Sequence, residues 1–366
     1  MAHAALLRHT QPLPKLRTGP RHGVSPVIYF PTPDYNVPAG GIRVVYRHVD
    51  LLNSAGIPAA VLHRRPGFRC TWFENHTTVA NSRDTVIGPQ DLVVVGELSA
   101  GLLDTLPPSQ RFAVFNQNPH LTWRQASEEL VGRYATSPAL AAIMTVSDHS
   151  AEMLRYLAPT AQILRFHNSI DPRIFHPGHE ERGRTIAYMP RRGLDEARQV
   201  FGLLRARGTL DGWRVLELEG VTEREVADRL RSTAVFLSFA FQEGFGLPAA
   251  EAMACGSYVI GFHGFSGREF FRPEFSDPIA PGDVVVMAQT VERVLQRETA
   301  TPGWCAARGA QAAAFVAVEY SPAREQQDVI RNYTALATSA GVPRTPEHAP
   351  VTREVSELNQ RAVGSR

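Results

Sequence analysis

The sequence predicts an α/β protein built from two doubly wound domains. Strand patterns alternate with amphipathic helical patterns along most of the chain, an order typical of parallel sheets covered by helices. The alternation starts near residue 27 and starts again near residue 185, after a polar passage that contains proline. A length of 366 residues also fits two domains of ordinary size.

The first domain opens with a strand, a loop and a helix. An apolar strand pattern covers residues 27–30, and Gly40 and Gly41 stand directly before a helical pattern. One apolar stripe on this helix consists of Ile42, Val45, Val49 and Leu52. Further strand patterns cover residues 59–62, 91–96, 112–115 and 141–147, and a helical pattern covers 148–157. We expect these strands to be parallel, with their carboxyl ends at one edge of the sheet.

Polar residues follow the strand predicted at 112–115, in the order Asn116-Gln117-Asn118-Pro119-His120. Ligands of parallel sheets bind beyond the carboxyl ends of the strands. His120 is therefore the first-domain candidate for contacting a substrate. A histidine at a strand end also serves as a structural hydrogen-bonding residue, and this alternative stays open.

The second domain begins with a strand at residues 185–189 and a basic loop, Pro190-Arg191-Arg192-Gly193. A solvated surface pair is one interpretation of Arg191 and Arg192. The strands at 213–217 and 234–240 enclose a helical pattern at 223–231.

The most informative stretch is AVFLSFAFQEGFGLPAAEAMACG, residues 234–256. A buried-strand pattern leads into a turn with Gly244 and Gly246, and an alanine-rich helical pattern follows. The glycines permit a tight turn, and Pro248 suits the first position of a helix. A helix N-terminus reached by such a turn presents free N–H groups and the positive end of the helix dipole. The stretch therefore predicts an anion-binding site.

Two glutamates bracket this anion-binding turn, Glu243 before it and Glu251 in the first helical turn after it, with seven residues between them. A carboxylate that accepts two hydrogen bonds suits a vicinal diol, such as a ribose or a sugar ring. The layout predicts an anion in the middle and hydroxyl groups on both sides, as in a nucleoside diphosphate sugar. The alternative is a helix N-terminus with solvated glutamates.

The segment EGFGLPAAEAMACG resembles the Glu-x7-Glu signature of retaining glycosyltransferases of the GT-B fold, above all family 4. The passage from Asn168 to Pro177 is similar to the one with which this family leaves its first domain, although Ser169 replaces the usual glycine. The resemblance covers roughly residues 25–335. It implies two Rossmann-like domains that face each other across a cleft, with the donor held mainly by the second.

The resemblance also implies roles for single residues. Glu251 would hold the ribose, Glu243 the donor sugar, and Arg191 or Arg192 the diphosphate; the family's following lysine is absent, and only Arg198 lies near its position. The catalytic candidates are Glu243, Arg191, Arg192 and His120, and the donor-binding candidates are Glu251, Gly244, Phe245, Gly246, Leu247, Gly267 and Glu269. Gly40 and Gly41 match a loop that faces the cleft, or they only begin a helix.

The function that follows from the resemblance is transfer of a sugar from a nucleoside diphosphate sugar to an acceptor hydroxyl, with retention of anomeric configuration. We expect a role in bacterial glycan or glycoconjugate biosynthesis, with a sugar, a lipid-linked glycan or a small molecule as acceptor. No cofactor beyond the co-substrate is expected, and the lack of any Asp-x-Asp pair predicts that no metal is required. A sugar-nucleotide epimerase and an inactive sugar-nucleotide-binding subunit are the alternatives. A phosphorylase would need a lysine for pyridoxal phosphate, and no lysine lies near the second-domain loops.

Composition bears on partners and location. A net charge of +2 is too small to indicate nucleic-acid binding. The three cysteines form no Cys-x-x-Cys pair and predict neither a disulfide framework nor a zinc site. No run of eighteen apolar residues occurs, so we expect a cytoplasmic protein.

The predicted division of the chain is as follows: a flexible basic tail at 1–23, an acceptor-side domain at 24–172, a nucleotide-sugar domain at 173–321, a helix that crosses back to the first domain at 322–340, and a disordered tail at 341–366. The basic tail predicts either weak attachment to an anionic membrane surface at the inner face or simple disorder. The sequence does not predict an oligomeric state.

Overall fold

A computed structural model describes residues 13–21, 25–178, 182–190 and 193–338. These residues form two compact units. Within the described ranges, the N-terminal unit comprises residues up to 146, then 150–166 and 326–338, and the C-terminal unit comprises 147–149 and 167–325. The chain therefore passes between the units at Phe166 and His167, earlier than the boundary at residue 172 that the sequence suggests.

The described part of the N-terminal unit contains a seven-stranded parallel sheet in the order β4-β3-β2-β6-β7-β8-β9. Its strands are β2 (Ile28–Pro31), β3 (Ala59–His63), β4 (Val79–Asn81), β6 (Leu92–Gly96), β7 (Phe112–Phe115), β8 (Leu140–Thr145) and β9 (Ile163–Arg165). The central strands read as continuous apolar runs because helices cover both faces of the sheet. The strand order reverses direction between β2 and β6, as in a doubly wound fold.

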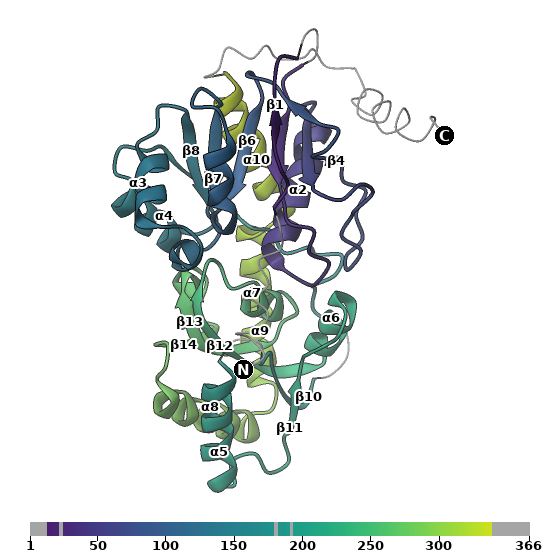
Figure 1. Cartoon of the computed structure of the whole chain (residues 1–366). Helices are drawn as coiled ribbons and strands as arrows, with labels where there is room; N and C mark the ends of the chain where they lie inside the picture. Colours follow the sequence, from purple (N-terminus) through teal and green to yellow (C-terminus); the bar gives the residue numbers. More distant parts are fainter. Residues whose placement is uncertain (1–12, 22–24, 179–181, 191–192, 339–366) are drawn as a thin grey trace. The chain divides into compact units, whose positions relative to one another are not determined.

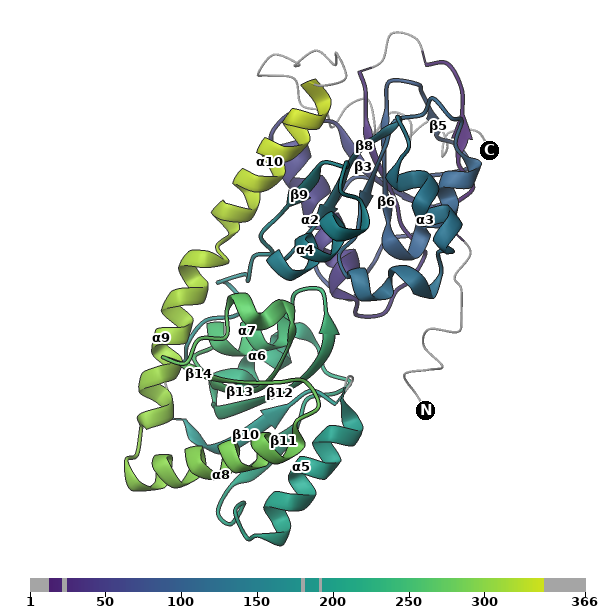
Figure 2. The ribbon, with the colours of Figure 1, turned by 90° about the vertical axis from the view of Figure 1, so that its left-hand side faces the viewer.

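Helices cover this sheet on both sides, with α10 beside α2 on one side and α3 on the other (Figure 2). The helical segments are α2 (Gly40–Ser54), η1 (Glu97–Thr105), η2 (Pro119–Arg124), α3 (Glu128–Ala135), α4 (Asp148–Leu157) and α10 (Pro322–Thr338). Tyr333 of α10 is fully buried, with its ring centroid 5.8 Å from that of Phe30 and 5.5 Å from that of Phe166. Helix α10 thus supplies part of the core of the N-terminal unit.

A small two-stranded sheet joins the beginning of the described chain to this unit. β1 (Arg17–Thr18) pairs in parallel with β5 (Val86–Ile87). Nearby, Arg21 donates to the buried Asp91 carboxylate at 2.6 Å. The sequence analysis places these residues in a flexible tail, but residues 17–21 are fixed by strand pairing and by this ion pair. The prediction was wrong here because the partners lie some seventy positions away in the sequence.

The described part of the C-terminal unit contains a five-stranded parallel sheet in the order β11-β10-β12-β13-β14. Its strands are β10 (Gly183–Tyr188), β11 (Arg214–Glu217), β12 (Thr233–Glu243), β13 (Tyr258–Phe265) and β14 (Ser276–Ile279). Its helices are α5 (Leu194–Ala206), α6 (Glu223–Arg231), α7 (Leu247–Ala254), α8 (Val284–Ala300) and α9 (Trp304–Glu319), with the short η3 (Ser266–Glu269).

In this unit α5 and α8 cover one face of the sheet, and α6 and α7 cover the other (Figure 1). Apolar residues of α5 and α8 pack with those of β10, β12 and β13 into one core cluster. The strand order reverses direction between β10 and β12. Among the described residues, no helix combines the length and the apolar character needed to cross a bilayer.

Candidate functional site

The reversal of strand order fixes where a ligand of the C-terminal unit should bind. Open parallel sheets bind ligands beyond the carboxyl ends of the strands, at the point where the strand order reverses. Here that point lies between β10 and β12. β10 and β12 are parallel neighbours, so their carboxyl ends lie at the same edge of the sheet, and the glycine-rich turn follows β12 there.

The turn from β12 into α7 has the backbone that its glycines were expected to permit. Gly246 caps α7 with φ of +100°, a value that side-chain-bearing residues avoid. α7 begins at Leu247, so Pro248 occupies its second position and not its first. In this first turn Pro248 has no N–H group, and the N–H groups of Ala249 and Ala250 donate to the Gly246 carbonyl oxygen at 3.2 and 3.4 Å. The turn stands at the positive end of the helix dipole, which attracts an anion.

Glu251 lies deeper in this structure than the sequence suggested. It is the fifth residue of α7, just beyond the first turn, and its side chain is only 8% exposed. Every residue of α7 from Ala249 to Ala254 is buried, because the helix is packed between neighbours on all sides. A carboxylate held on so enclosed a helix is fixed in position, as a ligand contact requires.

Glu243 is placed differently, at the end of β12 and only half-buried. It pairs with Phe265 of β13 after an irregularity in the register. The hydroxyl of Ser266 donates to the Glu243 carbonyl oxygen at 2.6 Å, which ties the two loops together. The donor-side turn is therefore attached to the Gly267-containing loop by a direct hydrogen bond.

Backbone strain is concentrated around Glu243. Among the described non-glycine residues, only Gln242 and Phe265 have positive φ, 53° and 68°. Such conformations cost about 1–3 kcal/mol each and gather at functional sites. The ring of Phe241, which is half exposed, lies 6.4 Å from that of Phe265. No sequence pattern pointed to these two phenylalanines, and Phe241 is the one that exposes an aromatic face beside Glu243.

The remaining donor-side candidates have structural partners. The Phe245 side chain is buried, with its ring 5.0 Å from that of Tyr320 and 5.3 Å from that of Phe270, so only its backbone faces the turn. Gly267 has no room for a side chain without displacing Phe271, whose ring would lie 3.2 Å from an added Cβ. One carboxylate oxygen of Glu269 accepts the Tyr320 hydroxyl at 3.0 Å. The other accepts the backbone N–H of Asp148 at 3.0 Å.

Arg191 and Arg192 lie outside the described residues. Their neighbour Gly193 caps α5 in the left-handed conformation, with φ of +81°. A Cβ at this position would lie 2.5 Å from the carbonyl oxygen of Phe239, so only glycine fits between the loop and β12. Gly193 thus lies directly against β12, the strand that leads to the glycine-rich turn.

In the N-terminal unit, the predicted residues lie near the point where the strand order reverses, between β2 and β6. Gly40 and Gly41 begin α2, and the Gln117 side chain donates to the Gly41 carbonyl at 3.0 Å. His120 is half-buried in η2, where its backbone N–H donates to the Asn118 side chain at 3.2 Å. The glycine loop and the segment that carries His120 are thus neighbours within this unit.

Glu97 also belongs to this group, and the sequence analysis missed it. It directly follows β6, and its carboxylate accepts the backbone N–H of Gln117 at 3.2 Å. Burial raises the pKa of Glu97 to about 7 from an ordinary value of 4.5. Its place directly after a predicted strand is the same signal that singled out His120, so the sequence contained a reason to include it.

Among the described residues, no three His, Cys, Asp or Glu side chains gather as a group that could hold a metal ion.

Comparisons with known proteins agree with this architecture. No family model matches the chain. A relative named alpha-1,6-glucosyltransferase, from Actinobacillus pleuropneumoniae serotype 7, is 27% identical over 262 residues, which cover 69% of this chain and 78% of the relative.

Two solved structures extend the comparison. Sucrose-phosphate synthase from Thermosynechococcus elongatus matches with a TM-score of 0.65 and 15% identity, over 86% of this chain and 100% of the other. Anabaena Alr3699/HepE, in complex with UDP and glucose, matches with a TM-score of 0.62 and 11% identity, over 85% and 100% of the two chains. Together with the two parallel sheets, these likenesses show that the chain has the GT-B fold of glycosyltransferases.

Proposed function

We propose that this protein transfers a sugar from a nucleoside diphosphate sugar to an acceptor hydroxyl, with retention of anomeric configuration. The observation that carries the proposal is the turn between β12 and α7, where a helix N-terminus stands between two carboxylates at the point of strand reversal. UDP and glucose are the first donor components to test. The sequence relative is named as a glucosyltransferase, and one structural neighbour was solved with UDP-glucose.

In the proposed complex each feature has one task. The N-terminus of α7, at the positive end of the helix dipole, binds the diphosphate, Glu251 binds the ribose diol, and Glu243 binds hydroxyl groups of the donor sugar. Arg191 or Arg192 adds charge to the diphosphate site. Gly40, Gly41, His120 and Glu97 are proposed as acceptor-side residues of the N-terminal unit.

The proposed reaction breaks the bond between the anomeric carbon and the diphosphate oxygen. The acceptor oxygen forms the new bond on the same face of the sugar, and the acceptor proton passes to the departing diphosphate. Protein catalysis then consists of positioning the two substrates and stabilising the negative charge of the leaving group. No covalent intermediate with the protein and no metal are needed in this scheme.

The proposed setting is cytoplasmic synthesis of a bacterial glycan or glycoconjugate, with the acceptor a sugar, a lipid-linked glycan or a small molecule. Weak attachment at a membrane surface through the basic residues near the start of the chain belongs to the same proposal.

A panel of sugar nucleotides tests the function. UDP-glucose, UDP-N-acetylglucosamine, ADP-glucose and GDP-mannose are compared for their effect on the melting temperature. A ligand at a hundred times its dissociation constant stabilises a protein by about 2.7 kcal/mol, so the correct donor should raise Tm clearly above the others. Slow release of the nucleoside diphosphate from that donor, with α-configured sugar as product of an α-linked donor, supports transfer with retention. Interconversion of sugar nucleotides would indicate an epimerase, and binding without any turnover would indicate an inactive subunit.

A further inference from the structure

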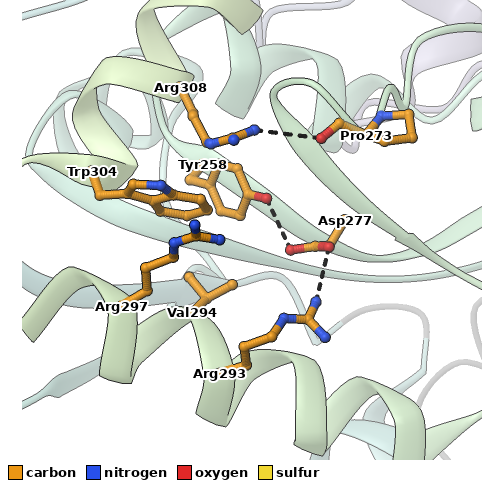
Figure 3. A pocket seen from close by; sticks show the side chains of 8 residues that line it. All are labelled: Tyr258, Pro273, Asp277, Arg293, Val294, Arg297, Trp304 and Arg308. Carbon is orange, nitrogen blue, oxygen red and sulfur yellow. Dashed lines mark hydrogen bonds and ion pairs between the residues drawn. The ribbon is translucent and has the colours of Figure 1, made fainter. Parts of the chain in front are cut away.

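A second site lies in the C-terminal unit, in a pocket of ≈ 130 Å³ between the sheet and helices α8 and α9 (Figure 3). Three arginine side chains line it, Arg293 and Arg297 from α8 and Arg308 from α9. Asp277 of β14 is the one acidic side chain among the lining residues. The pocket therefore carries an excess of positive charge.

This pocket is distinct from the proposed donor site. Tyr258, which lines it, is the first residue of β13, whereas Phe265, beside Glu243, is the last residue of the same strand. Seven residue steps along a parallel strand correspond to roughly 23 Å at about 3.3 Å per residue. The pocket thus lies at the amino end of the sheet, and the donor turn lies at the carboxyl end.

Two of the three guanidinium groups are held in place by Trp304. The Cζ atom of Arg308 lies 4.6 Å from the centroid of the indole ring, and that of Arg297 lies 5.1 Å from it. Arg308 also donates through Nη1 to the carbonyl oxygens of Pro273 and Glu274. Cation–π contacts of this kind orient the guanidinium groups while leaving N–H donors at their edges.

The acidic groups nearby do not neutralise these two arginines. Asp277 accepts hydrogen bonds from Tyr258 at 2.9 Å and from Arg293 at 3.1 Å, so its charge is paired with Arg293. Glu298 accepts the backbone N–H groups at the start of α9, at 2.8 and 2.7 Å. Within the described part of the chain, Arg297 has no hydrogen bond from its side chain and no ion pair.

We propose that this pocket binds a phosphate group, as inorganic phosphate or as the end of a phosphate monoester. Clustered guanidinium groups bind phosphate oxygens with paired, charge-assisted hydrogen bonds. The volume is well below the roughly 300–1,000 Å³ of sites for whole cofactors, so the pocket admits a phosphate group but not a complete sugar nucleotide. Because its arginines come from α8 and α9, a bound phosphate joins these two helices and stabilises the C-terminal unit.

The test measures the affinity for inorganic phosphate by ³¹P NMR in the presence of saturating UDP, which occupies the donor site. Arg297→Gln should weaken phosphate binding about ten-fold or more, the scale for hydrogen bonds to a charged group. The matched control is Arg205→Gln, because Arg205 also lies over an aromatic ring, at 5.6 Å from that of Phe201 on α5, but outside the pocket. Equal phosphate affinity in wild type and Arg297→Gln would overturn the proposal, as would no binding by the wild type at 100 mM phosphate.

A second readout needs no variant of the pocket. The indole N–H signal of Trp304 should shift on addition of phosphate but not of chloride at equal ionic strength, and an unmoved signal contradicts the proposal. A parallel arm uses vesicles of phosphatidic acid, a phosphate monoester, in phosphatidylcholine. Vesicle binding by the wild type that is much tighter than its binding of free phosphate, and that Arg297→Gln loses, would assign the phosphate group to a lipid. If UDP does not bind, only the proposed function is contradicted. The phosphate affinities of wild type and Arg297→Gln can then be compared in the absence of UDP.

Discussion

Glu243 and Glu251 have the same side chain but different surroundings, and their proposed roles follow from this difference. Glu251 is buried on a helix packed on all sides, whereas Glu243 is half-buried at a strained turn whose carbonyl is held by Ser266. A fixed carboxylate suits the binding of a part of the donor that does not react. A carboxylate on a strained and more exposed turn suits the part that changes during the reaction.

Glu97 gives a pH-dependent prediction. Its pKa is raised to about 7 in the folded chain, from an ordinary value of 4.5, because burial disfavours its charged form. The stability that this proton contributes is fully present below pH 4.5 and is lost as the pH rises through 7. Glu97→Gln, which cannot ionise, should therefore gain stability relative to wild type as the pH rises, by on the order of 1–2 kcal/mol after allowance for partial exposure.

Urea unfolding of both proteins at pH 5 and pH 8 checks this expectation. The comparison of wild type with Glu97→Gln cancels the titration of all other groups. A difference in unfolding free energy that is the same at both pH values would show that Glu97 does not hold a proton in the folded chain.

At the scale of single elements, the turn into α7 depends on one glycine. An added Cβ at Gly246 would meet the Phe270 ring at 3.5 Å, an ordinary contact, so space is not limiting. The backbone conformation is limiting, because the φ of Gly246 is +100°, a value that alanine avoids. Gly246→Ala should therefore lower the free energy of unfolding by roughly 1–2 kcal/mol, and it should weaken UDP binding because it shifts the first amides of the helix.

The control is Gly202→Ala in the middle of α5. Gly202 has helical geometry, and a Cβ added there would meet no atom within 4 Å. Alanine should stabilise this helix by roughly 0.5–1 kcal/mol and leave UDP binding unchanged. A loss of stability at both glycines would mean that the conformation of Gly246 is not the cause.

The sequence predicted those elements whose pattern is local. Apolar runs identified β2, β3, β6, β7 and β12, and the helix that follows Gly40 and Gly41 was identified by its apolar stripe. β12 runs on to Glu243, beyond the predicted end at residue 240, because irregular pairing with β13 continues past the apolar run. β14 was missed because Ser276–Ile279 carries no apolar run.

The unpredicted parts of the site depend on contacts between distant residues. The raised pKa of Glu97 depends on its burial, and the hydrogen bond from the N–H of Gln117, twenty positions away, opposes the rise. The link from Ser266 to the Glu243 carbonyl joins two loops that no local pattern connects. Positions of polar residues after strands were predictable from sequence, but their burial and partners were not.

At the scale of the whole molecule, the two units share an architecture but differ in strand order, and each has one point of reversal. Both points carry glycine-bearing turns and polar side chains, which is why substrate contacts are proposed in each unit. In the C-terminal unit the described residues place a helix N-terminus between two glutamates, Glu243 and Glu251. We therefore assign the donor diphosphate to this unit.

This assignment predicts that transfer requires no divalent metal. The α7 amides and the guanidinium groups of the loop after β10 are proposed to balance the diphosphate charge. The rate of sugar transfer in excess chelator should stay within about two-fold of the untreated rate, far from the 10²–10³-fold loss typical when a main electrostatic contact is removed. Abolition of transfer by chelator, with recovery on addition of magnesium or manganese, would show that the charge is balanced by a metal.

Calorimetric titration of UDP into wild type, Glu251→Gln and Glu243→Gln tests the central claim most directly. We expect one UDP per wild-type chain. Glu251→Gln should bind about ten-fold or more weakly, because hydrogen bonds to a charged group contribute about 1.5–3 kcal/mol, and Glu243→Gln should stay within about two-fold of wild type. Absence of UDP binding by the wild type at millimolar concentration, or equal weakening in the two variants, would contradict the assignment of the donor to this turn.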